Sequence, residues 1–180
     1  MSWHTKRIKW GACTVGALTA AVLAVSTSPA AASGTYSGLD YVYGSGGWVG
    51  DWSNEGVLSV NTHASSNATC MWQAILWADG KLASTSDIDG IFGDKTYNAT
   101  RAWQSGERLT VDGVVGKATF GRAEVRLVYS SGSYSAGQTV DFIYKGKVNW
   151  LSVKRDADGN YQFWDFVVWR KAGYNYRTCT

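Results

Sequence analysis

The apolar positions of this chain recur every three or four residues between about residues 57 and 124, and every second residue from 125 onward. The first regular stretch predicts a helix over 65–79, with one apolar face made of Met71, Trp72, Ile75, Leu76 and Trp77. Three residues at its start are N-cap candidates: Ser66, Asn67 and Thr69. Gly80 is placed to end the helix in a left-handed conformation.

Two shorter helices are predicted after this one. The second begins near Asp94 or Lys95 and is stopped by Gly106, and its inner face consists of Thr96, Ala99 and Trp103. The third begins near Lys117, and its inner face consists of Phe120, Ala123 and Val125. Residues 57–124 are therefore expected to form one helical unit.

Strands are predicted over the remaining part, 125–180. Four segments are rich in Val, Ile and aromatic residues with period-two alternation: 125–130, 139–145, 147–155 and 161–170. In the second of them, Val140, Phe142 and Tyr144 share one face. Gly, Ser and Asp residues mark the turns, at 130–133, 145–147 and 156–160. The expected fold class is α+β: a three-helix bundle followed by a small antiparallel β-sheet.

Two segments precede the helical unit. Residues 1–32 begin with basic residues, continue with a short apolar run and end with Ala30 and Ala32 at small-residue cleavage positions, which predicts a secretory signal peptide. A retained N-terminal anchor is the alternative. Residues 33–56 form an arm rich in Gly, Ser and aromatic residues, which either packs onto the body or offers rings for stacking on sugars.

Charge and cysteine content fit an exported protein. The chain has 17 basic and 14 acidic side chains, and removing the three basic residues of the signal leaves 17 − 3 = 14 against 14, a net charge of zero. This balance argues against nucleic acid, or an anionic membrane after signal removal, as a partner. Cys70 and Cys179 are the cysteines outside the signal and predict one disulfide, joining the first helix to the last strand.

A doubled motif is the most specific signal in the sequence. DIDGIFGDKT at 87–96 is followed by TVDGVVGKAT at 110–119, with Asp, both Gly and Thr at matching positions. In such a loop the Asp side chain can accept backbone N–H groups just beyond it, and each Gly tolerates positive φ. The repeat predicts two copies of a loop that opens a helix.

These residues resemble the peptidoglycan-binding-like domain of bacterial cell-wall proteins over residues 57–124. The matching positions are Gln73, Leu76, Gly80, DGIFGDKT, Ala99, Trp103, Gln104, Leu109 and VDGVVGKAT. The chain departs from the family where Arg108 replaces the usual Gly before Leu109 and where Ala123 replaces a larger aliphatic residue.

The resemblance implies a three-helix bundle that binds the glycan or stem peptide of peptidoglycan without cutting it. The binding candidates that it implies are Asp89, Phe92, Tyr97, Trp103, Gln104 and Asp112. A structural role competes at most of them: the aspartates can cap turns, the glutamine can satisfy buried backbone, and the large aromatics can fill the core. Tyr97, on the exposed side of its helix by spacing, is the strongest contact candidate.

No catalytic or metal-binding set is visible in the sequence. Outside the signal His63 stands alone, so neither a zinc site nor an activated Cys70 thiol is supported. Two carboxylates could meet in the fold to form a glycosidase-type pair, such as Asp51 with Glu55 or Asp141 with Asp165, but nothing else in the sequence supports either pair. We therefore expect no enzymatic activity, no metal and no cofactor.

The leading hypothesis is a secreted, extracellular or wall-associated protein that binds peptidoglycan without catalysis. The second is a secreted inhibitor or protein-interaction module that uses the aromatic sheet residues Trp150, Trp164, Trp169, Tyr174 and Tyr176. The third is a small cell-wall hydrolase.

Overall fold

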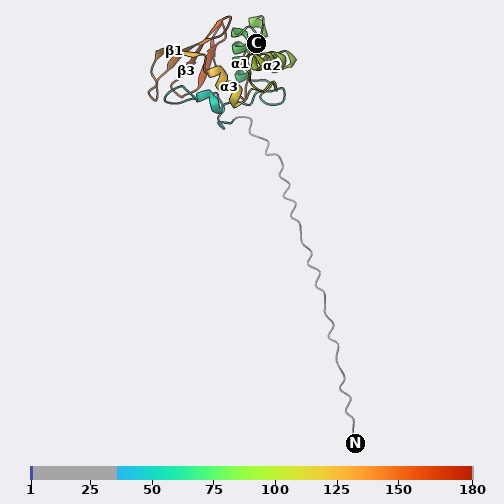
Figure 1. Ribbon diagram of the computed structural model, residues 1–180. Helices are drawn as coiled ribbons and strands as arrows, with labels where there is room; N and C mark the ends of the chain where they lie inside the picture. Colours follow the sequence, from blue (N-terminus) through green and yellow to red (C-terminus); the bar gives the residue numbers. More distant parts are fainter. Residues whose placement is uncertain (2–35, 180) are drawn as a thin grey trace.

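The computed structural model describes residue 1 and residues 36–179, so the predicted signal at 1–32 lies outside the described residues. The elements in chain order are η1 (Asp51–Asn54), α1 (Asn67–Ala78), η2 (Thr85–Asp87), α2 (Asp94–Gly106), α3 (Lys117–Glu124), β1 (Leu127–Gly132), β2 (Val140–Lys145), β3 (Trp150–Arg155), β4 (Tyr161–Trp164) and β5 (Trp169–Lys171). Figure 1 shows the sheet, in orange to red, standing beside the helices, in green to yellow. The predicted order of helices followed by an antiparallel sheet is confirmed.

Helix α1 lies at the centre of the molecule. The Ser66 side chain caps it by accepting the N–H of Thr69, and Gly80 follows its end with a φ of 68°. All of its residues except Trp77 are buried, because α2 packs against it from one side and the sheet from another. A helix covered all round has no wide polar face, which explains why its residues are mostly apolar or small, with Gln73 as a buried polar exception.

Helices α2 and α3 begin where the sequence predicts, each directly after a glycine. The end of α2 differs from the prediction, because Gly106 is still helical and Arg108 adopts the left-handed conformation, with a φ of 59°. The inner face of α3 also differs. Glu124 is buried, whereas Val125 is 63% exposed, because the carboxylate turns inward to accept backbone N–H groups from the arm.

The five strands form an antiparallel meander in the order β1-β2-β3-β4-β5. Its inner face packs on the helical unit and carries the buried side chains Leu127, Val140, Phe142, Tyr144, Leu151, Val153, Tyr161 and Phe163. The shared face predicted for β2 is confirmed by its alternating burial. The outer face bears no helix in the described part of the chain.

Two strand boundaries differ from the prediction. The segment 161–170 is two strands rather than one, because the Asp165 side chain accepts the N–H groups of Val167 and Val168 and closes a turn. The turn expected at 130–133 lies later, since β1 continues to Gly132 through an irregularity in its pairing with β2.

The described part of the arm packs onto the body. Trp52 is fully buried, with its ring 6.2 Å from that of Phe120 and 5.4 Å from that of Tyr161. Tyr41 and Tyr43 form isolated bridges to Gly173 and Asn160. The packing alternative is therefore the one that the structure supports.

A covalent link and a buried polar network tie the sheet region to the helices. Cys70 and Cys179 form the predicted disulfide, with Cα atoms 6.6 Å apart, although Cys179 lies in the tail beyond β5 rather than in a strand. Asp79, at the end of α1, accepts the Tyr144 hydroxyl and the backbone N–H of Lys147, both at 2.8 Å. It also accepts a hydrogen bond from Trp103 Nε1 and pairs with Arg126, so the buried Asp79 carboxylate has a cationic partner.

Candidate functional site

The first Asp-Gly loop is organised by the buried amide of Gln73. Its Nε2 donates to the Asp89 carboxylate at 2.8 Å, to the Ile91 carbonyl at 3.1 Å and to the Thr96 hydroxyl at 2.9 Å. Its Oε1 accepts the N–H of Gly90 at 2.7 Å. Asp89 itself accepts the N–H of Ile91 at 2.8 Å, as an Asx turn requires.

The second loop repeats this arrangement around Gln104. Its Nε2 donates to Asp112 at 2.8 Å, to the Val114 carbonyl at 2.9 Å and to the Thr119 hydroxyl at 3.2 Å. Its Oε1 accepts the N–H of Gly113, and Asp112 accepts the N–H of Val114. The repeat in the sequence is thus a repeat of hydrogen bonds, with a glutamine from the preceding helix at the centre of each loop.

The glycines of the two loops adopt the same conformation, with φ of 72° at Gly90 and 74° at Gly113. Their surroundings differ. A Cβ at Gly90 would stand 2.6 Å from the Cys70 sulfur and 2.7 Å from the Cys179 sulfur, whereas one at Gly113 would overlap the Tyr97 ring. The first loop is therefore covered by the disulfide and the second by a single half-exposed tyrosine.

The C-terminal tail completes the cover of the first loop. Arg177 Nη1 donates to the Asp89 carbonyl at 2.7 Å, and the side chain of Asn67 accepts the N–H of Thr178 at 2.8 Å. Backbone of α1 joins the tail as well, since the N–H of Asn67 donates to the Tyr176 carbonyl. Much of this loop's outer side is consequently occupied by the chain itself.

Two pairs of a tyrosine and a cation flank the second loop. The Arg101 guanidinium lies 5.8 Å from the centre of the Tyr97 ring, and Lys117 Nζ lies 4.5 Å from that of Tyr36. Asp112 is exposed between the elements that carry them. We call these five residues the open loop surface. It offers apolar ring faces beside cations that can bind carboxylates.

The structure separates the six predicted binding residues into two groups. Phe92, Trp103 and Gln104 lie inside the protein, at 2%, 1% and 1% exposure. Asp89 and Tyr97 are both half-buried, the former within the covered first loop and the latter over the second, and Asp112 is exposed. The doubled motif could not indicate this difference, because it depends on where the tail runs.

An acidic cluster holds the arm against the body, and the sequence did not indicate that Glu124 joins Asp51 and Glu55 in it. Glu124 accepts the N–H groups of Gly50 and Trp52, both at 2.8 Å, and burial raises its pKa. Burial also raises the pKa of Glu55 to about 7, against the opposing effect of a 2.7 Å hydrogen bond from Tyr174. Burial likewise raises the pKa of Asp51, against the lowering effect of the Tyr161 hydrogen bond and the Arg155 charge.

The residues considered for catalysis are occupied by structural contacts. His63 Nδ1 lies 2.8 Å from the Val57 carbonyl, with its ring beside that of Tyr174. Asp51 and Glu55 hold the arm, as described above. The turn predicted at 156–160 is likewise structural, because Asp156 closes it by accepting two backbone N–H groups. Among the described residues, no group of three or more His, Cys, Asp or Glu side chains is placed to hold a metal ion.

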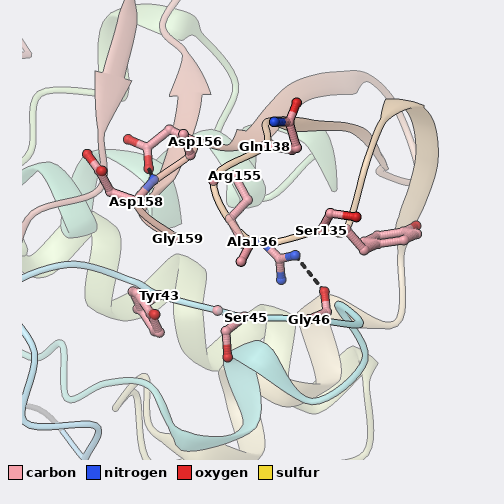
Figure 2. Close-up of a pocket in the computed structure, with 14 residues that line it drawn as sticks. Tyr43, Ser45, Gly46, Ser135, Ala136, Gln138, Arg155, Asp156, Asp158 and Gly159 are labelled. Carbon is pink, nitrogen blue, oxygen red and sulfur yellow. Dashed lines mark hydrogen bonds between the residues drawn. The ribbon is translucent and has the colours of Figure 1, made fainter.

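A small polar cavity of about 120 Å³ lies where the arm meets two loops of the sheet. Figure 2 shows Arg155 extending from β3 toward the arm, with its guanidinium bonded to the Gly46 carbonyl. The same guanidinium pairs with Asp51 at 2.7 Å. The Arg155 guanidinium thus already binds the arm. The cavity is better explained as a packing gap between the arm and the two loops than as a ligand site.

Comparison with known proteins gives one match. Residues 66–122 match the family model described as "Putative peptidoglycan binding domain". The matched segment begins at the cap of α1, ends within α3 and contains both Asp-Gly loops. No curated protein and no solved structure matches the chain.

The resemblance predicted from the repeat is therefore confirmed for this segment, and the match indicates cell-wall binding with peptidoglycan as the ligand. The disulfide is consistent with a cell-wall or extracellular location. Within the described part of the chain, no helix is long and apolar enough to cross a bilayer.

Proposed function

We propose that this protein is secreted and binds peptidoglycan without cutting it, through the open loop surface of its helical unit. The observation that carries the proposal is the difference between the two loops of the matched segment. Both have the same internal hydrogen bonds, but the tail covers the first, while the second presents Tyr97 and Arg101 to solvent. The aspartate and the flanking cation are therefore more accessible to a polymer at the second loop than at the first.

The chemistry of this surface suits the polymer. Peptidoglycan combines sugar rings, which have apolar faces, with carboxylates on its stem peptides. Tyr97 and Tyr36 can pack against the ring faces, and Arg101 and Lys117 can pair with the carboxylates. Such a shallow surface needs the additive effect of several contacts along one strand of polymer.

Lack of catalysis is part of the proposal. It is supported by the disulfide at Cys70, by the structural contacts of His63 and by the hydrogen bonds that the Asp51 and Glu55 carboxylates accept from Arg155 and Tyr174. The hydrolase hypothesis remains the alternative that an activity assay must address.

The aromatic interaction module receives less support. Tyr174 is buried, at 1% exposure, and bonds to Glu55. Trp164 and Trp169 meet edge to face, at an interplanar angle of 64°, so they do not form a flat aromatic platform. Trp150 and Tyr176 are exposed but lie on different parts of the molecule.

Co-sedimentation with purified sacculi tests the proposal. Tyr97→Ala should weaken binding by about tenfold, the loss expected for one good aromatic contact of about 1.4 kcal/mol. Asn98→Ala is the matched control, because Asn98 is the exposed neighbour on the same helix. Failure of the unaltered protein to sediment with sacculi would contradict the proposal. Release of sugar or peptide fragments from the same sample would instead support the hydrolase hypothesis.

A further inference from the structure

Exposed apolar side chains gather at one end of the sheet. The β2–β3 hairpin turns at 146–149 and the β4–β5 hairpin turns at 165–168, and the pairing of Val153 with Phe163 brings both turns to the same end. We call the exposed residues there the hairpin-tip patch: Val148, Trp150, Phe166, Val167, Val168 and Trp169. Val148, Trp150 and Val167 are 67%, 68% and 72% exposed. Large apolar side chains left in water in this number indicate a binding surface.

The second hairpin tip is held in place. Phe166 has a φ of 75°, a left-handed conformation that side chains other than glycine rarely adopt. The Asp165 side chain fixes the turn by accepting the N–H groups of Val167 and Val168, at 3.0 and 2.7 Å. Trp77 supports the Phe166 ring edge to face, with ring centres 4.9 Å apart. A cavity of about 260 Å³ separates the tip from η2, so on that side the tip is not covered by the helical unit.

Cations surround the patch. Lys145 Nζ lies 5.5 Å from the centre of the Trp150 ring, and Lys154 Nζ lies 4.3 Å from that of Trp169. Lys81 follows Gly80, whose Cβ position would stand 2.7 Å from a Val148 methyl group. Within the described part of the chain, none of these three lysines has an ion-pair partner.

Carboxylates near this end are neutralised. Asp165 is paired with Arg170, and the buried Glu107 carboxylate lies among Arg122, Arg126 and Lys147. The acidic cluster of Asp51, Glu55 and Glu124 instead lies at the arm, beside the other end of β3. The overall charge balance argues against an anionic membrane, but the charges are separated, and local clustering sets attraction to a surface.

We propose that the hairpin-tip patch docks the protein onto a lipid bilayer that contains anionic headgroups. The valines at the two tips enter the boundary with the acyl chains, the indoles lie at the interface where tryptophan is favoured, and the three lysines reach the phosphates. This contact is separate from the open loop surface and does not rest on wall binding. A flat aromatic platform for sugars is disfavoured by the edge-to-face arrangement of Trp164 and Trp169.

Flotation of the purified protein with vesicles tests this proposal. We expect it to float with vesicles of phosphatidylcholine and phosphatidylglycerol, and much less with phosphatidylcholine alone. Val167→Asp and, on the other tip, Val148→Asp should each reduce the bound fraction by about tenfold, while sacculus binding stays unchanged. Val49→Asp is the matched control, because Val49 is 82% exposed and lies in the arm.

The electrostatic part has its own variant. Replacing Lys81, Lys145 and Lys154 together by Gln should weaken binding to anionic vesicles by about a hundredfold and flatten its salt dependence. Brominated lipid should quench tryptophan fluorescence in the unaltered protein.

The proposal is overturned if the protein does not float with anionic vesicles at low salt, or if Val167→Asp and Val49→Asp behave alike. It is also overturned if Val167→Asp impairs sacculus binding but not flotation, since the patch would then belong to the wall-binding surface. Equal urea midpoints for the variants exclude misfolding as the cause of any loss.

Discussion

The loops at 89–96 and 112–119 are built by equivalent hydrogen bonds, yet the C-terminal tail lies over the first, whereas a half-exposed tyrosine ring lies over the second. Gln73 and Gln104 each bind an aspartate, a threonine, a carbonyl oxygen and a glycine N–H in corresponding positions. Beyond these contacts the loops diverge, since a disulfide closes over Gly90 and a tyrosine ring over Gly113. The motif thus specifies how a loop is built, and the segments packed around it determine what the loop can bind.

Removing the disulfide should have the largest effect on the free energy of unfolding, and of the two loops it should expose only the first. With Cys70→Ser and Cys179→Ser together, we expect the free energy of unfolding to fall by about 4–5 kcal/mol. The disulfide joins residues 109 positions apart, so its loss gives the unfolded chain much more conformational freedom. Urea unfolding measures the loss. Under conditions where the variant remains folded, it should still bind sacculi, and loss of binding by folded protein would show that the covered loop participates.

Substituting the two glutamines compares the loops directly. Gln73→Leu and Gln104→Leu should each lower the free energy of unfolding by about 3 kcal/mol, because each leaves a buried glycine N–H without an acceptor and removes the amide that holds the aspartate and threonine of the loop. Only Gln104→Leu should also weaken sacculus binding, since it loosens the open loop. Clearly unequal stability losses would show that the loops are not equivalent internally.

Changing the pH should loosen the tail that covers the first loop. Tyr174 of this tail donates to Glu55, whose pKa burial raises from 4.5 to about 7. The folded state therefore holds the Glu55 proton more tightly than the unfolded state. The stability that this proton contributes is fully present below pH 4.5 and is lost as the pH rises through about 7. We expect a loss of roughly 3 kcal/mol, measured by urea unfolding across this range.

Glu55→Gln is the control for the pH effect. It keeps a hydrogen-bond acceptor for Tyr174 but cannot ionise, so most of the slope of stability against pH should disappear. A slope that persists in this variant would assign the effect to the raised pKa of Asp51 or Glu124 instead.

The smallest effect concerns the connection between α2 and the second loop. Arg108 has a φ of 59° where the resembling family usually has glycine. Arg108→Gly should raise the free energy of unfolding by about 0.5–1 kcal/mol, because relief of the left-handed strain exceeds the added entropy of the unfolded chain. Thermal unfolding can resolve this difference, and a lower melting temperature would contradict the assigned strain.

The sequence predicts the helical unit well because its signals are local. The caps of α1, the glycines before α2 and α3, and the Asp-Gly repeat each act within a few residues, and the structure has them where expected. The disulfide follows from cysteine count alone. Local turn chemistry also explains one miss, since Asp165 interrupts a segment whose apolar residues otherwise indicate one continuous strand.

Long-range contacts account for what the sequence does not predict. Glu124 is buried because the arm, more than 70 residues earlier, donates two N–H groups to it. The cover over the first loop depends on Arg177 and Cys179, and the patch at the hairpin tips depends on strand register. None of these contacts leaves a periodic pattern, so candidate site residues could be proposed from the motif but not sorted into covered and open.

The affinity for sacculi of two arginine variants tests the difference between the loops most directly. Arg101 stands beside the open second loop, and Arg177 lies on the tail over the first. We predict that Arg101→Gln weakens binding by about tenfold through loss of a charged contact of about 1.4 kcal/mol, and that Arg177→Gln leaves it unchanged. Weaker binding by Arg177→Gln with Arg101→Gln unaffected would contradict the account, because it would place the ligand on the loop that the tail covers.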